Sequence, residues 1–331
     1  MYSTAVVLNL LKKIKYQGKN LINDDSLLDL LVQEEKIIIV LDADKFDAAA
    51  YEDIKSLIIK NLLASLKINA DSLKIIFSKE KKVKKERIPN VKKVIVVASG
   101  KGGVGKSTIA AGLAVALSKT MNVGLLDADV YGPSIPHLFG IKQKPDIADN
   151  NKINPILKAG VNLMSMGFLI DEGQPVIWRG PMLSKALFQI THGVNWCFND
   201  RELDILIIDT PPGTGDIHLT LATKYLIDGV IFVTTPQLLA VKDTIKSIEM
   251  FIELGIPIIG IVENMSYFLE STGLKKDVFG KNKIKLAELE YLARIPLIES
   301  IAQAEYIDSN IFSLKDYFSK LAFAVKTFIE N

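Results

Sequence analysis

Short, continuous apolar runs alternate with longer amphipathic stretches along most of the chain. Runs of this kind are typical of strands that are buried on both faces of a parallel sheet. We therefore expect an α/β fold, a doubly wound and mostly parallel sheet with helices on both faces. The expected strands are Val94 to Ala98, Val123 to Leu126, Val161 to Met166, Ile205 to Ile208, Gly229 to Thr234 and Pro257 to Val262.

The first 78 residues have a different pattern, which predicts a small α+β domain without an evident catalytic cluster. Helices are expected over Thr4 to Ile14, Ser26 to Leu31 and Tyr51 to Leu66, and strands over Lys36 to Leu41 and Ser72 to Phe77. The expected division is a small domain over 1–78, a basic linker over 79–93 and a larger domain over 94–331.

The linker is expected because the sequence KEKKVKKERIPNVKK is rich in charge and poor in apolar residues. Seven lysines and Arg87 stand against Glu80 and Glu86. A solvated linker is the favoured interpretation, and a patch for nucleic acid or a membrane surface is the alternative. Because interleaved aromatics and a second basic cluster are lacking, we expect no specific nucleic-acid partner.

The composition suits a cytoplasmic protein with a large core. Of 331 residues, 49% are hydrophobic, but no apolar run approaches the roughly 20 residues that cross a bilayer, so we expect no integral membrane association. Cys197 is the single cysteine, which excludes an internal disulfide and fits a reducing compartment. Its neighbours Trp196 and Phe198 favour a buried thiol.

The sequence GKGGVGKST at residues 100 to 108 fits the phosphate-binding pattern G-x-x-x-x-G-K-[ST]. A buried strand precedes it and a helix, Ser107 to Ser118, is expected to follow, so the helix N-terminus would face the phosphates. We therefore predict a nucleoside triphosphate site. Its residues are Gly100, Lys101, Gly102, Gly103, Val104, Gly105, Lys106, Ser107 and Thr108.

Lys101 is a second cation in this loop. From this position in the loop, Lys101 can hardly contact the phosphates that Lys106 binds, because its side chain would have to turn away from the site of its own subunit. We expect Lys101 to reach a nucleotide that a second subunit holds.

Three aspartates stand directly after expected strands, where ligands of such sheets bind. Asp127 and Asp129 follow Leu126, and one of these carboxylates is expected to position the attacking water. Asp209 follows Ile208 and is expected to hold Mg²⁺ through water, together with Ser107. Helix capping or turn formation is the alternative for each aspartate, and it is strongest for Asp127.

The segment from Pro211 to Gly215, which follows Asp209, resembles a switch that senses the γ-phosphate. His137, His192 and His218 are scattered without metal-ligand spacing, so structural or solvent-facing roles are expected for them.

Five motifs in this order resemble the Mrp/ApbC family of P-loop ATPases, iron-sulfur cluster carriers of the deviant Walker A group. They are GKGGVGKS, DADVYGPS, WRGPM at residues 178 to 182, DTPPGTGD, and ENMSYF at residues 263 to 268. The resemblance covers about residues 91 to 312. The small N-terminal domain resembles a degenerate MIP18-type domain.

This resemblance implies a Mg²⁺-dependent ATPase that is a homodimer with ATP at its interface and delivers clusters to apoprotein clients. It also implies a role for each matching residue. Lys101 would reach the partner's nucleotide, Lys106 the β- and γ-phosphates, Ser107 and Asp209 the Mg²⁺, Asp129 the attacking water and Asn264 the adenine.

One departure from the family concerns the cluster itself. Family members usually carry a C-x-x-C shortly after NMSYF, so that two subunits present four thiolates. Here Glu270, Ser271 and Thr272 occupy that region and no cysteine is present. The ligands of an iron-sulfur cluster are therefore unknown, and Cys197 lies in a different segment.

Two functions remain open for the sequence. The first is an ATP-hydrolysing iron-sulfur carrier or assembly factor, with unusual ligands or a partner's cysteines for the cluster. The second is a dimeric nucleotide switch of the Min or Par type, which acts through a partner or a membrane surface. WRGPM and ENMSYF favour the first.

The apolar face of the C-terminal segment, Leu314 to Phe328, bears on this choice. On a membrane surface it would favour the switch, but we expect it to pack on the sheet.

Overall fold

The computed structural model describes residues 4–23, 26–32, 36–66, 68–78, 85–148, 151–169, 180–269, 274–280, 289–297 and 316–330. The chain divides into two units, Met1–Lys84 and Lys85–Asn331, each with its own core. Trp178, Arg179, the segment Glu270 to Thr272 and Leu314 lie outside the described residues.

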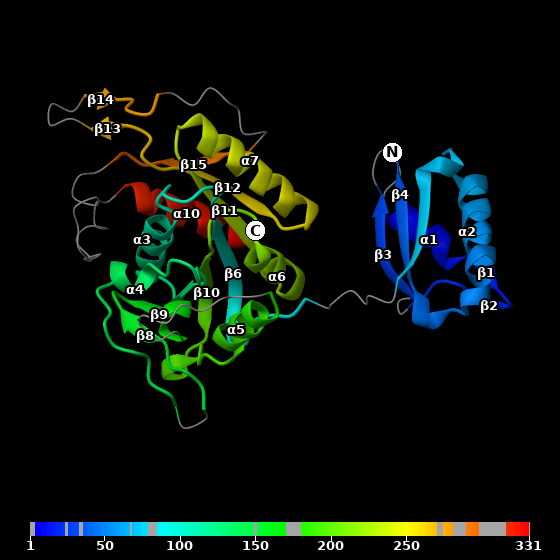
Figure 1. The fold of residues 1–331 in the computed structure, drawn as a ribbon, viewed down its shortest axis with the longest axis horizontal. Coiled ribbons are helices and arrows are strands. Elements are labelled where there is room, and N and C mark those ends of the chain that lie inside the picture. Colours follow the sequence, from blue (N-terminus) through cyan, green and yellow to red (C-terminus); the bar gives the residue numbers. More distant parts are fainter. Residues whose placement is uncertain are drawn as a thin grey trace. The chain divides into compact units, whose positions relative to one another are not determined.

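An eight-stranded sheet forms the centre of the larger unit (Figure 1). Its strand order is β15-β12-β11-β6-β10-β7-β9-β8, and every neighbouring pair is parallel except β8 and β9. The mostly parallel sheet predicted from the apolar runs is thus confirmed. The strands are β6 (Val91–Ala98), β7 (Val123–Asp127), β8 (Ile156–Lys158), β9 (Val161–Ser165), β10 (Leu203–Asp209), β11 (Gly229–Thr234), β12 (Ile258–Glu263) and β15 (Tyr291–Arg294).

Helices cover both faces of this sheet. On one face, a core forms between the sheet and α5 (Gly180–His192), α6 (Asp216–Lys224) and α7 (Leu238–Glu253). On the other, a second core forms beneath α3 (Lys106–Ser118) and α10 (Tyr317–Glu330), with the short helix α4 (Ile135–Leu138) beside α3. Strand side chains alternate between the two cores, which explains why the strands read as unbroken apolar runs.

The C-terminal helix α10 packs on α3 and β15, as expected. Phe318, Leu321 and Val325 are buried in the core, whereas Phe323, on another face of the helix, is 72% exposed. The apolar face that could have served a membrane surface is therefore occupied by the domain's own core. No helix in the described part of the chain has the length and apolar character needed to cross a membrane.

The smaller unit is a three-stranded sheet with two helices packed into one core. Strand β3 pairs antiparallel with β4, and β4 pairs parallel with β5. A two-stranded hairpin, β1 and β2, follows the first helix. The elements are α1 (Thr4–Lys12), β1 (Lys15–Tyr16), β2 (Lys19–Asn20), β3 (Leu27–Val32), β4 (Ile37–Asp42), α2 (Tyr51–Ser65) and β5 (Leu73–Ser78).

The prediction of a helix over Ser26 to Leu31 is wrong, because all of these residues except Ser26 belong to strand β3. Leucine is a good helix former, but an apolar run of this length is too short to nucleate a stable helix by itself. Pairing with β4 satisfies the backbone of this segment in a ladder instead.

The basic segment expected as a linker over 79–93 is divided between the two units. The larger unit begins at Lys85, Ile88 is 1% exposed within its core, and β6 already begins at Val91. Glu86 also donates a backbone hydrogen bond to Lys224, the last residue of α6, and accepts one from Leu226. The residues 85 to 93 are therefore part of the larger unit, and their lysines flank the buried side chain of Ile88.

We predict that Leu321→Ala lowers the free energy of unfolding of the larger unit by about 2–5 kcal/mol, because it opens a cavity under α10. Phe323→Ala on the same helix should change it by less than about 0.5 kcal/mol. Urea unfolding followed by tryptophan fluorescence checks this, since Trp178 and Trp196 both belong to the larger unit. Equal losses for the two variants would contradict the observed packing.

Candidate functional site

The glycine-rich loop joins the carboxyl end of β6 to the N-terminus of α3. Gly105 is the N-cap of α3 and has φ of 82°, and Gly103 has φ of 79°. Both angles lie in the left-handed region, which glycine enters at little cost. The loop therefore turns sharply enough for the free N–H groups of the first turn of α3 to face the space above the sheet.

Gly100 is required for a different reason, which is space. A Cβ atom at this position would overlap the backbone of Asp243 and Thr244 in α7. By contrast, a Cβ at Gly102 would meet only the Pro212 side chain, at 3.8 Å. The loop is thus seated directly on α7 at its first glycine.

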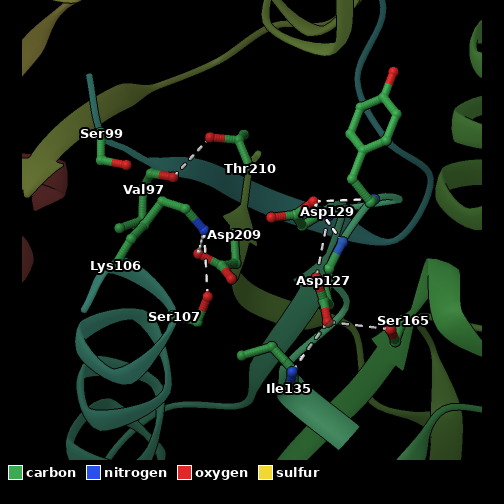
Figure 2. Close-up of polar contacts among 12 residues, drawn as sticks. Val97, Ser99, Lys106, Ser107, Asp127, Asp129, Ile135, Ser165, Asp209 and Thr210 are labelled. Carbon is green, nitrogen blue, oxygen red and sulfur yellow. Dashed lines mark hydrogen bonds and ion pairs between the residues drawn. The ribbon is translucent and has the colours of Figure 1, made fainter. Parts of the chain in front are cut away.

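A buried ion pair lies beneath the loop (Figure 2). The Lys106 Nζ donates to Asp209 Oδ1 at 2.5 Å and to Ser107 Oγ at 3.3 Å. Lys106 is 6% exposed and Asp209 is fully buried. Burial raises the pKa of Asp209, and the Lys106 ammonium opposes that rise. The cost of burying the carboxylate is offset by this partner.

The second carboxylate oxygen of Asp209, Oδ2, is buried and has no hydrogen-bond partner among the described residues. A carboxylate oxygen with a serine hydroxyl close by is a donor set that suits the hard cation Mg²⁺. Asp209 and Ser107, the two residues predicted for the metal, are therefore brought together by the fold, with Lys106 between them.

Asp127 serves the local backbone. Its Oδ1 accepts from the backbone N–H of Asp129 at 3.1 Å, and its Oδ2 accepts from Ile135 N and Ser165 Oγ at 3.0 and 3.2 Å (Figure 2). Ile135 is the first residue of α4, so Asp127 caps the start of that helix, which was the alternative role considered for it. Burial and the nearby charge of Asp209 raise its pKa to about 7.

Asp129 shapes the turn after β7 and also faces a cavity. Its Oδ1 accepts from the backbone N–H groups of Tyr131 and Gly132, both at 3.1 Å. The cavity measures about 550 Å³ and is lined by Asp129, by residues of the segment that leads into α6 and by the first turn of α6. Among them are Pro211, Pro212, Gly215 and His218. Asp129 therefore has one side fixed by the turn and lies beside a space large enough for water and part of a ligand.

The remaining predicted residues lie around the loop. Lys101 is exposed, and its ammonium makes no ion pair with a residue in the described ranges. Val104 is 3% exposed and packs into the core, while Thr108 is half-buried in the first turn of α3. Asn264, directly after β12, donates from Nδ2 to the Val104 carbonyl at 2.9 Å, so it contacts the loop itself.

Sequence reasoning missed a second buried network, formed by Thr210 and His218. Thr210 Oγ1 lies 2.9 Å from His218 Nε2 and 3.0 Å from the carbonyl oxygen of Val97. His218 is fully buried. Its position in the first turn of the helix after DTPPGTGD was the available signal, but burial depends on α7, which covers the ring at Phe251.

Cys197 is half-buried rather than fully buried, so the prediction of a buried thiol is wrong. Its neighbour Trp196 is buried against Gly124, near the start of β7. Cys197 therefore lies toward the amino ends of the parallel strands. The seven residues of β10 separate that edge from Asp209 by about 20 Å. In the described part of the chain, no group of three or more His, Cys, Asp or Glu residues is arranged to hold a metal ion.

The doubly wound sheet, the glycine-rich loop and the buried Lys106–Asp209 pair define a P-loop NTPase. The family model described as ParA, NUBPL iron-transfer P-loop NTPase, matches residues 90–330. An iron-sulfur cluster carrier protein of Rickettsia felis is 42% identical over 281 residues, 83% of this chain and 85% of that protein. The chain belongs to this family of iron-sulfur cluster carriers.

Solved structures agree with this assignment. A nucleotide-binding protein of Archaeoglobus fulgidus in complex with ADP is 34% identical, with a TM-score of 0.58 over 70% of this chain and 92% of that chain. The septum site-determining protein MinD of Pyrococcus horikoshii in complex with Mg-ADP has a TM-score of 0.52 over 72% and 97%, at 20% identity. At that identity, the second likeness shows the fold alone.

We predict that Gly100→Ala lowers the free energy of unfolding of the larger unit by on the order of 1–3 kcal/mol, because the new methyl group must displace the backbone of α7. Gly102→Ala should change it by less than about 0.5 kcal/mol. Thermal unfolding without nucleotide, followed by tryptophan fluorescence, compares the two. Similar midpoints for both variants would show that the loop is not seated on α7.

Proposed function

We propose that this protein is an ATP-hydrolysing iron-sulfur cluster carrier or assembly factor that delivers clusters to apoproteins. The observation that carries the proposal is the buried Lys106–Asp209 pair beneath the loop, with Ser107 beside it. The iron-sulfur cluster is proposed as the transported group because of the family match over residues 90–330 and the relatives named iron-sulfur cluster carriers.

ATP would be bound chiefly by the loop and by the first turn of α3. The Lys106 ammonium lies within reach of the loop and would pass from Asp209 to the β- and γ-phosphates. Mg²⁺, held by Ser107 and by Asp209 through water, would neutralise part of the phosphate charge. Asp209 then keeps a cationic neighbour in both states, so its buried carboxylate is never left without a counter-charge.

Asp129 would position the attacking water from the edge of the cavity. Phosphoryl transfer depends mainly on orientation and charge stabilisation, so a carboxylate that is fixed by Tyr131 and Gly132 suits this role. Asn264 would contact the adenine, and its bond to Val104 keeps it against the loop.

A homodimer would complete the site. Lys101 is exposed at the loop, where a second copy of the chain would present its nucleotide. Leu238 and Leu239, at the start of α7 on the same edge of the sheet, are 56% and 64% exposed. Exposed leucines at the same sheet edge as an exposed cation are suited to burial in a subunit interface.

The cluster needs thiolates that this chain does not supply in full. A dimer contains two copies of Cys197, and both lie at the sheet edge away from the nucleotide site. We therefore propose that a partner or client protein provides most of the cysteine ligands, and that ATP controls the transfer.

Substitution of the two lysines tests the site. We expect Lys106→Ala to abolish nucleotide binding, that of ADP included, because it removes the phosphate ligand and leaves Asp209 buried without a partner. Lys101→Ala should keep nucleotide affinity and lose hydrolysis by about 10³-fold, because a cation supplied across the interface acts on the transition state. Isothermal titration with ADP and steady-state ATP hydrolysis measure the two effects. Full hydrolysis by Lys101→Ala would remove the cross-subunit role.

The cargo is tested by iron and acid-labile sulfide per chain after anaerobic reconstitution, compared between the native chain and Cys197→Ser. We expect less than one cluster per dimer in both, and ATP-dependent reactivation of an apo [4Fe–4S] dehydratase when a cluster donor is added. Lys106→Ala is the control and should show no ATP effect. A stoichiometric cluster that Cys197→Ser removes would contradict the proposal that partners supply the ligands.

A further inference from the structure

We propose that His218 is a positioning residue for this hydrolysis, and that it acts through Thr210 on the segment between Asp209 and α6. The inference rests on the proposed ATPase function. It concerns a hydrogen-bonded chain from His218 through Thr210 to the carbonyl group of Val97, called here the 218–210–97 relay (Figure 2 shows its Thr210–Val97 part).

The direction of each hydrogen bond in the relay follows from counting protons. The Thr210 hydroxyl has one proton, and the Val97 carbonyl oxygen can only accept, so Thr210 donates to Val97. Thr210 must then accept from His218, which places the proton of the ring on Nε2. The ring is thereby assigned to one neutral tautomer.

The surroundings of His218 keep the ring in that state. It is fully buried, with the edge of Phe251 packed against it at 5.8 Å between centroids, and its Nδ1 has no partner among the described residues. Burial, together with the charge of Lys106, lowers its pKa to about 4, and the nearby backbone of Gly215 opposes only part of this shift. A ring with such a low pKa stays neutral at neutral pH and is a poor general base, but its Nε2–H group can donate a hydrogen bond at all times.

The relay connects the residues on either side of Pro211 to Gly215, the segment that the sequence identifies as a switch. Thr210, directly before this segment, and Gly213, in its middle, donate their backbone N–H groups to the carbonyl groups of Val97 and Ser99, at 3.3 and 2.8 Å. At its end, His218 lies in the first turn of α6. The His218–Thr210 bond therefore joins the two ends of the segment and ties both to the strand that leads into the phosphate loop.

Two features of the site depend on where this segment lies. Asp209 immediately precedes Thr210, so a shift of Thr210 changes the placement of the carboxylate beside Lys106. Pro211, Pro212 and Gly215 line the cavity together with Asp129, so the same shift changes the cavity in which Asp129 would position the water. The phosphates of a bound nucleotide would be held mainly by the loop, and loss of the relay would leave the loop in place. Loss of the relay should therefore slow hydrolysis more than it weakens binding.

The test compares kcat for ATP with the Kd for ADP in the full-length protein. Thr210→Val keeps the shape of the side chain and removes the hydroxyl, and His218→Leu removes the donor. We expect kcat to fall at least about tenfold in each, with the Kd for ADP changed less than about threefold. The double variant should be no slower than the slower single variant, because both break one relay.

Conservative variants separate positioning from a general structural role. Thr210→Ser restores the hydroxyl and His218→Gln restores an N–H donor, so both should recover most of the lost rate. Thr223→Val makes the same substitution at an exposed position of α6, where the hydroxyl bonds only within its own helix, and should match the native rate. Native kcat in Thr210→Val, or equal losses of kcat and ADP affinity, would overturn the proposal.

Nuclear magnetic resonance of the ring nitrogens tests the relay independently of hydrolysis. The chain has three histidines, so the signals of His218 are assigned by comparison with His218→Gln. We expect a neutral ring protonated on Nε2 from pH 8 to pH 5.5, with the Nε2–H signal shifted in Thr210→Val. A His218 ring that is protonated on Nδ1, or charged at pH 6, refutes the relay. A native protein that shows the expected signals and does not hydrolyse ATP refutes the proposed function instead.

Discussion

The parallel pairing of β6 with β10 is the constraint on which the site depends. In this register Asp209 lies opposite Val97, just before the phosphate loop begins. The two strands therefore deliver the loop and the carboxylate to the same edge of the sheet, where the Lys106–Asp209 pair forms. Successive side chains of a strand point to opposite faces, so a slip of one residue would turn Asp209 away from Lys106. The core on both faces opposes such a slip, because every strand side chain would change sides.

Much of the larger unit follows from local pattern. Its six expected strands all form, because short apolar runs rich in β-branched residues, such as Ile205 to Ile208, suit strands that are buried on both faces of a sheet. The position of the phosphate loop follows as well, since glycines and flanking elements are local signals. Strand β3 and the extent of the basic segment could not be predicted from local pattern in the same way. Whether Leu27–Val32 forms a strand depends on β4, and whether Ile88 is buried depends on the domain that receives it.

The site shows the same division between local and distant causes. The sequence places Asp127, Asp129 and Asp209 after strands, and the fold gives them different tasks. Asp127 holds the turn and α4, whereas Asp209 faces the lysine of the loop. The task of each carboxylate depends on which backbone N–H groups and charged side chains the folded chain brings next to it. The burial of His218 beneath α7 has a similar origin, because Phe251 is distant in the sequence.

Cys197 has a practical consequence beyond cluster chemistry. The chain carries one thiol, which is half-buried and lies at the sheet edge remote from the phosphate loop. A maleimide dye would therefore label each chain at one known point without occupying the nucleotide edge. Energy transfer between two dyes of different colour would report when two chains associate and separate, and so would follow the assembly through a cycle of ATP turnover.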